Sequence, residues 1–202
     1  MKKFLLLLLS ICLTISCLSS CGNKKKQALK SAENVYVELS TAAAYCEEIS
    51  EGIYGAWYFA IYEAKGYGYG DIILNYTKRT GIDDDSLLAV AESYGYNILE
   101  LLDGLKSLDF ALEVTLKALE INDTTPKFQT ALSDAKENLD TLSDKHIDFE
   151  DLSKLKSLYN KIKAYSEKLL NFAGMNFYQL EDHIDKYKPE IEELLSELDY
   201  LS

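Results

Sequence analysis

The amino-acid sequence predicts an all-α protein, an elongated antiparallel bundle of four to five helices of which two are long. The main observation is that apolar residues recur at alternating steps of four and three over unusually long stretches, which is the spacing of a buried helical seam. The chain also contains only two prolines, and neither falls within the alternating pattern of a strand. No strand–helix–strand rhythm is present, so the sequence favours helices packed on helices.

The first long helix is predicted over residues 26–64, where one apolar seam continues without a fault. At 1.5 Å per residue, this helix is about 55–60 Å long. Many of the seam residues are small, which lets a neighbouring helix approach closely. Cys46 lies in the seam and is therefore expected to be a buried small hydrophobe rather than a reactive thiol. The seam residues are Ala28, Ala32, Val35, Leu39, Ala42, Cys46, Ile49, Ile53, Ala56 and Ala60.

The second long helix is predicted to begin at Asp83–Asp85, where negative charge suits the positive end of the helix dipole. Before it, the glycines within 66–70 interrupt the first helix, and a short helix capped by Asp71 is expected to end at Gly81. Because the second seam is as long as the first, the two long helices are expected to pair antiparallel along the whole molecule. The second seam consists of Leu87, Ala91, Tyr94, Ile98, Leu101, Leu105, Leu108, Leu112, Thr115 and Leu119.

The next two predicted helices are shorter. Thr125 is the predicted N-cap of a helix with Pro126 at its first position, which extends to about residue 142. The following turn contains Asp148, which is the predicted N-cap of a helix that carries its apolar seam over 152–173.

The apolar seam slips by one residue after this helix. A break is therefore predicted at 174–176, where Asn176 and Gln179 have the spacing of a capping box. One continuous helix that absorbs the slip as an 11-residue repeat is the alternative. The last helix is predicted over 177–201, with a kink and a restart near Pro189.

The N-terminus has the layout of a secretory signal. Two lysines precede an apolar core over 4–18, which is too short to count as a membrane span. The segment ends in Leu18-Ser19-Ser20-Cys21, which resembles the lipobox of bacterial lipoproteins. The resemblance implies that residues 1–20 are a signal peptide and that Cys21 becomes the first mature residue, with a thioether-linked diacylglycerol. The alternatives are an ordinary secreted protein with an incidental cysteine, an uncleaved anchor, and Cys17 as a weaker lipidation site.

The rest of the chain divides into a lipidated, basic tether over 21–27 and one helical-bundle domain over 28–202. Removal of 1–20 takes away two lysines and no acid, so the net charge changes from −12 to −14. Nucleic acid and anionic lipid headgroups both repel a chain this acidic. The basic cluster Lys24–Lys26, with Lys30, is the exception and is expected to favour an anionic membrane surface. Lipidation of Cys21 would leave Cys46 as the one thiol of the mature chain, so no intramolecular disulfide is expected.

Tyrosine is heavily used around the glycine-rich segment 66–70. Tyr54, Tyr58 and Tyr62 form a ladder, in which each ring stands four residues from the next on one helix face. One interpretation is an aromatic patch at the membrane-distal tip, which would stack on sugar rings or seat a protein partner. The other is ordinary packing of rings in a thin, alanine-rich bundle. The candidate patch consists of Tyr54, Trp57, Tyr58, Tyr62, Tyr67, Tyr69, Tyr94 and Tyr96.

No catalytic or metal-binding pattern stands out in the sequence, and no cofactor is predicted. The Glu-x-x-His motif of di-iron bundles is absent, because Ser143 and Leu180 stand three residues before the only histidines, His146 and His183. Asp83–Asp85 lacks the alternation and the terminal Glu of a calcium loop. Gly-x-Ser-x-Gly is absent too, and the glycine–tyrosine segment lacks the strand and Lys-Ser/Thr of a nucleotide loop.

The sequence therefore predicts a non-catalytic lipoprotein that is anchored on the extracytoplasmic side of a cell membrane or outer membrane and binds a protein, a glycan or an envelope component. One alternative is an envelope hydrolase or metal-dependent enzyme whose carboxylates come from different helices. Another is an accessory or sensor subunit of a transport or signalling complex. A homodimer through the long heptad seam is left open.

Overall fold

The structure is a computed structural model that describes residues 2–171 and 175–202, with side chains from Lys24 onward. All regular elements in these residues are helical, as the sequence predicts, and none of these helices is apolar over enough length to cross a bilayer. The α-helices are α1 (Lys2–Tyr58), α2 (Tyr69–Thr80), α3 (Asp84–Tyr94), α4 (Ile98–Gly104), α5 (Leu108–Ile121), α6 (Thr124–Lys145), α7 (Leu152–Leu169) and α8 (Phe177–Leu198). A π-helical turn, η1 (Phe59–Glu63), continues α1, and the short 3₁₀ helices are η2 (Ala64–Gly66) and η3 (Asp199–Leu201).

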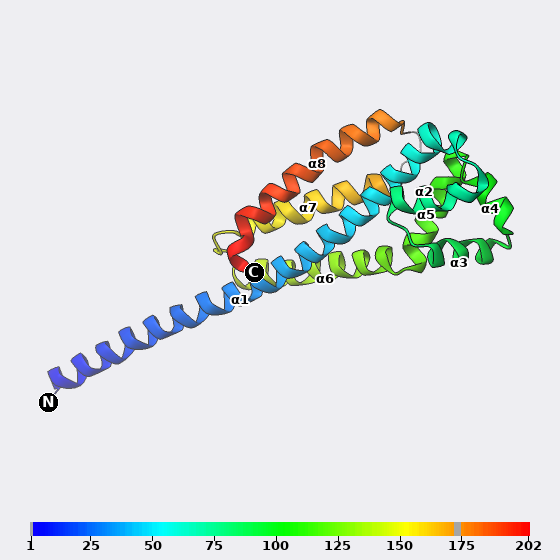
Figure 1. Ribbon diagram of the computed structural model, residues 1–202. Coiled ribbons are helices and arrows are strands. Elements are labelled where there is room, and N and C mark those ends of the chain that lie inside the picture. The colour runs from blue at the N-terminus through cyan, green and yellow to red at the C-terminus, as the bar shows by residue number, and fades with distance from the viewer. Residues whose placement is uncertain (1, 172–174) are drawn as a thin grey trace.

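The long helix α1 is the centre of the molecule, and it contacts α2, α5, α6, α7 and α8. In Figure 1, α1 and α7 run away from the N-terminus, whereas α6 and α8 return in the opposite direction. We call these four helices the proximal bundle; α2, α3, α4 and α5, the distal segment, gather at the far end of α1 (Figure 1). All ten residues of the first predicted seam are buried, with at most 6% of each exposed, so this seam is confirmed.

The second long helix is a wrong prediction, because the chain from 84 to 121 forms three helices rather than one. Gly95 adopts a left-handed conformation with φ 72°, which ends α3. Asn97 then starts α4 with a capping box that includes Glu100. As a result Tyr94 and Ile98, two positions of the predicted seam, are 40% and 44% exposed. α5 is the part of this region that packs on α1, and α6 packs along α1 more extensively.

The distal segment is held to α1 by a close crossing and a buried hydrogen bond. A Cβ atom on Gly55 would lie 2.1 Å from the carbonyl oxygen of Arg79, so α1 and α2 cross with their backbones in contact. Tyr76 of α2 is fully buried, and its hydroxyl donates to the carbonyl oxygen of Ala111 at 2.7 Å. Gly81 ends α2 in the left-handed conformation, as predicted.

Several predicted helix starts differ from the observed ones. The N-cap of α2 is Gly68, so Asp71 lies in the first turn rather than at the cap. The N-cap of α6 is Asp123, with φ 67°, and Thr125 lies inside the helix instead of capping it. The N-cap of α7 is Asp151, not Asp148, because the turn after α6 continues for three more residues. None of these three N-cap residues makes a side-chain capping hydrogen bond, so the presence of a capping residue type at a suitable spacing does not fix where these helices start.

The break before the last helix is confirmed. α7 ends at Leu169 and α8 begins at Phe177, with the predicted capping box between Asn176 and Gln179. Gly174, where the break was placed, lies outside the described residues. The restart predicted near Pro189 is wrong, since α8 continues through this proline as one helix.

Candidate functional site

The tyrosine ladder (Tyr54, Tyr58 and Tyr62) packs against the start of α8. The ring centroids of Tyr58 and Tyr62 are 5.0 Å apart. Phe177, the first residue of α8, lies among the ladder rings, 5.2 Å from Tyr54 and 5.7 Å from Tyr62. Trp57 is buried beneath them, with 3% exposed. The inner side of the ladder is therefore part of the core that joins α1 to α8.

Polar contacts cover much of the ladder's outer side. The Tyr54 hydroxyl donates to a carboxylate oxygen of Glu181 at 3.0 Å, and burial together with this hydrogen bond raises the pKa of Tyr54. The guanidinium of Arg79 lies 4.8 Å from the centroid of the Tyr58 ring and pairs with Glu63. Tyr62, which is 54% exposed, is the open end of the ladder.

Tyr67 and Tyr69 diverge although they are two residues apart. The ring of Tyr67 is half-buried and stacks on Phe59, with centroids 6.1 Å apart. The Tyr69 hydroxyl instead donates to Asp103 of α4 at 2.8 Å, and the ammonium of Lys106 lies 4.4 Å from the centroid of its ring. This hydrogen bond raises the pKa of Tyr69 and lowers that of the Asp103 carboxyl. Tyr69 therefore belongs with α4 and not with the ladder.

Tyr94 and Tyr96 form a separate exposed surface at the turn between α3 and α4. Their ring centroids are 5.6 Å apart, and Tyr96 packs on Phe110 of α5 at 5.4 Å. Every residue of 92–100 is exposed. Ile98 and Leu99 follow directly, with 44% and 57% exposed, so two aliphatic side chains extend the aromatic pair. We call Tyr94, Tyr96, Ile98 and Leu99 the α3–α4 surface.

The eight residues of the candidate patch thus lie in different surroundings. Tyr54, Trp57, Tyr58 and Tyr62 form one cluster with Phe177 and Tyr178. Tyr96 instead packs on Phe110 of α5. Sequence reasoning missed Phe177 and Tyr178, although the predicted turn before them was a signal that the chain returns there to the distal end. It also missed the exposure of Leu99 and Ile98, because the seam pattern placed Ile98 in the core.

The described residues contain no group of three or more His, Cys, Asp or Glu side chains arranged to hold a metal ion. Cys46 is 1% exposed, and burial raises the pKa of its thiol to about 12, as expected for a small core residue. Comparisons of the chain with protein-family models, with curated proteins and with solved structures found no match.

Proposed function

We propose that the mature chain is a lipid-anchored, extracytoplasmic binding protein whose α3–α4 surface docks a protein partner. The observation that carries this proposal is the uninterrupted exposure of residues 92–100, which include two tyrosines, an isoleucine and a leucine. Contiguous exposed apolar side chains are typical of interaction sites, and tyrosine is enriched among the residues that dominate binding energy.

The position of the α3–α4 surface supports the same proposal. α4 lies at the end of the molecule opposite the N-terminus (Figure 1). The part of α1 from Lys24 to Tyr58 spans about 50 Å at 1.5 Å per residue. An acyl anchor at Cys21 would therefore hold this surface well clear of the bilayer, where a partner in the envelope can reach it.

Charge favours a partner with a basic rim. The chain has a net charge of −12, and Glu92 and Glu100 flank the α3–α4 surface. Opposite charge on the partner would speed the encounter and select the orientation, while the tyrosines and aliphatic side chains supply buried area.

Site-specific photo-cross-linking in cells tests the docking surface. A photoreactive amino acid in place of Tyr96 is expected to give one discrete adduct. The matched control places it at Val37, which is 55% exposed on α1 of the proximal bundle, and is expected to give no such adduct. Leu99→Asp should weaken the Tyr96 adduct about tenfold, since it places an uncompensated charge in an apolar contact. The same adducts from positions 37 and 96, or turnover of an envelope polymer by the purified protein, would contradict the proposal.

The anchor is tested separately. Mass spectrometry of the N-terminal peptide is expected to find the diacylglycerol on Cys21 and no residue of 1–20. Cys21→Ser should release the protein from membranes, because stable attachment needs the acyl chains. An unmodified Cys21, or membrane retention of the serine variant, would contradict lipid anchoring.

A further inference from the structure

We propose that the end of the proximal bundle nearest the N-terminus is a second membrane contact, which rests on the headgroups of anionic phospholipids. The inference rests on the proposed lipid anchor at Cys21. It concerns a part of the fold that is distinct from the α3–α4 surface, at the opposite end of the molecule (Figure 1).

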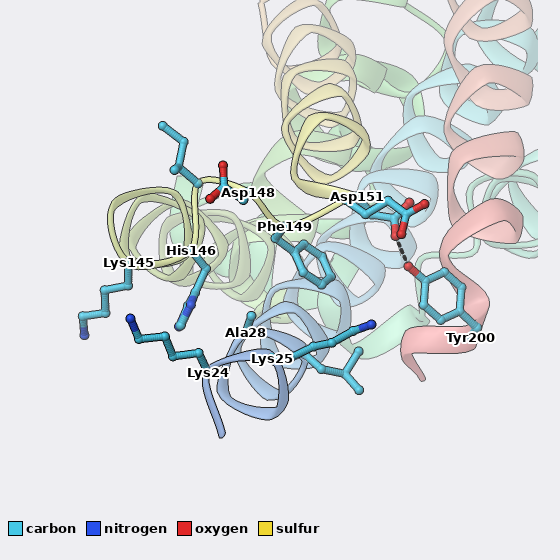
Figure 2. Close-up of a pocket in the computed structure, with 12 residues that line it drawn as sticks. Lys24, Lys25, Ala28, Lys145, His146, Asp148, Phe149, Asp151 and Tyr200 are labelled. Atoms are coloured by element: carbon cyan, nitrogen blue, oxygen red, sulfur yellow. Dashed lines mark hydrogen bonds between the residues drawn. The ribbon is translucent and has the colours of Figure 1, made fainter. Parts of the chain in front are cut away.

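A cavity of about 550 Å³ lies at this end of the bundle. The start of α1, the loop 146–151 between α6 and α7, and Tyr200 beside the C-terminus line it (Figure 2). Three segments that are far apart in the sequence therefore meet where the chain emerges from the anchor.

Four basic side chains line this cavity. Lys24 and Lys25 come from α1, and Lys145 and His146 from the end of α6. Figure 2 shows Lys24, Lys145 and His146 at one side of the cavity, while Lys25 extends toward the other. None of the three lysines forms an ion pair within the described part of the chain. Although the net charge of the chain is −12, these three unpaired lysines complement an anionic surface at this end of the bundle.

Acidic residues also line the cavity, and all three come from the loop 146–151, whereas Lys24 and Lys25 come from α1. Asp151 accepts a hydrogen bond from the Tyr200 hydroxyl and lies 3.6 Å from the ammonium of Lys154. Asp148 lies above His146 and Lys24 in the view of Figure 2. Glu150 is the remaining carboxylate of the lining. Asp151 thus has partners within the protein, whereas Asp148 and Glu150 are exposed to solvent.

Apolar side chains stand beside the cations. Ile147, at the start of the α6–α7 loop, is 74% exposed, the largest value among the exposed large hydrophobic residues of the described chain. Leu29 of α1 is 40% exposed and lines the same cavity. Ile147 directly follows Lys145 and His146, and an aliphatic side chain beside basic ones suits the boundary between headgroups and acyl chains, where both chemistries are satisfied.

The anchor places this end at the correct depth. Cys21 and Lys24 lie on the same continuous helix, three residues apart, which is a rise of about 4.5 Å. Acyl chains that enter the bilayer from Cys21 therefore hold Lys24 and the neighbouring loop at the level of the lipid phosphates. Contact at two points would also orient the bundle, so that the α3–α4 surface points away from the membrane.

An environment-sensitive fluorophore on Ile147→Cys tests the contact in the full, lipidated protein. Cys46 should not react, because it is buried and its thiol pKa is raised. The matched control is Leu74→Cys on α2, which is 67% exposed at the distal end and carries any background label equally. In vesicles of phosphatidylglycerol with phosphatidylcholine, the label at 147 is expected to shift to the blue and to be quenched about threefold more by spin-labelled lipid than the label at 74.

Removal of the lysine charges tests whether the contact is with the lipid headgroups. The combined variant Lys24→Gln, Lys25→Gln and Lys145→Gln should reduce the quenching at 147 to the level found in pure phosphatidylcholine, and high salt should act in the same direction. Equal, weak quenching at 147 and 74 in anionic vesicles would overturn the proposal. A blue shift at 147 produced equally by soluble glycerol phosphate without vesicles would also overturn it, since the cavity would then bind free phosphate.

Failure of the anchor and failure of the contact are distinguishable. If Cys21 carries lipid and the label at 147 stays in water, the contact is refuted while the anchor stands. If Cys21 carries no lipid, the proposed anchoring is refuted. The contact is then judged by adding anionic vesicles to the unlipidated chain: a blue shift at 147 supports it and no shift overturns it.

Discussion

Replacement of Gly55 by alanine should break the contact that holds the distal segment on α1. Gly52 and Gly55 lie one turn apart on this helix, and both are buried. A Cβ on Gly55 would stand 2.1 Å from the carbonyl oxygen of Arg79 and 2.6 Å from its carbonyl carbon. A Cβ on Gly52 would meet its nearest atoms at 3.5 Å, an ordinary contact distance. Backbone atoms move only if the whole of α2 shifts, so the two glycines should respond in opposite directions.

The magnitudes follow from two opposing terms. Alanine in place of glycine stabilises a helix interior by about 1 kcal/mol. Overpacking against backbone costs about 3 kcal/mol, at the upper end of its usual range. Gly55→Ala should therefore lower the free energy of unfolding by about 2 kcal/mol, whereas Gly52→Ala should raise it by up to about 1 kcal/mol.

Urea unfolding followed by the helical circular dichroism signal measures both variants on the protein without residues 1–21. For a chain of this size, Gly55→Ala should also lower Tm by about 4–8 °C. A Gly55→Ala variant as stable as Gly52→Ala would refute the close crossing of α1 and α2. Because that crossing positions α2, the same variant should weaken the Tyr96 photo-adduct.

Three further predictions concern the core and one helix start. Tyr76→Phe removes the buried hydrogen bond to Ala111 and should cost about 1 kcal/mol in urea unfolding; an unchanged midpoint would mean that this hydroxyl is solvated. Asn176→Ala removes the acceptor for the backbone N–H of Gln179 and should lower the free energy of unfolding by about 1 kcal/mol. Asn176→Asp keeps an acceptor and should lower it by less. Cys46 should resist alkylation at pH 8 in the folded protein and react in urea, because its thiol pKa of about 12 keeps it protonated and burial blocks access. Alkylation of the native protein at the rate of a free cysteine would contradict this placement.

Helix periodicity predicted the first seam correctly and the second incorrectly for the same physical reason. A seam records which face of a helix is apolar, but it does not record whether the helix is continuous. Gly95 was compatible with a helix interior at a modest cost, yet the left-handed conformation there and the Asn97 capping box end one helix and start another. By contrast, glycine at 52 and 55 left α1 intact, because α2 packs over this part of the helix.

The candidate site followed the same pattern. Tyrosines near 54–69 and 94–96 were identified from composition and spacing, since a ladder at i, i+4 is a local property of one helix. Their grouping was a question of which helix ends meet. Phe177 joins the ladder because α8 begins at the distal end, and Tyr96 meets Phe110 where α3 packs on α5.

By itself, the amino-acid sequence determined the helical class, the buried face of α1, the capping box at Asn176 and the break before α8, because each depends on residues within a few turns of one another. It also carries the lipobox-like segment on which the proposed anchor depends. Only the tertiary structure decided which helices lie beside α1, which aromatic rings stay exposed, and that the cationic start of α1 meets the α6–α7 loop at one cavity. Those features depend on which helices pack together, and the contacts that join them link residues far apart in the chain, such as Glu38 with Asn138 and Tyr54 with Glu181.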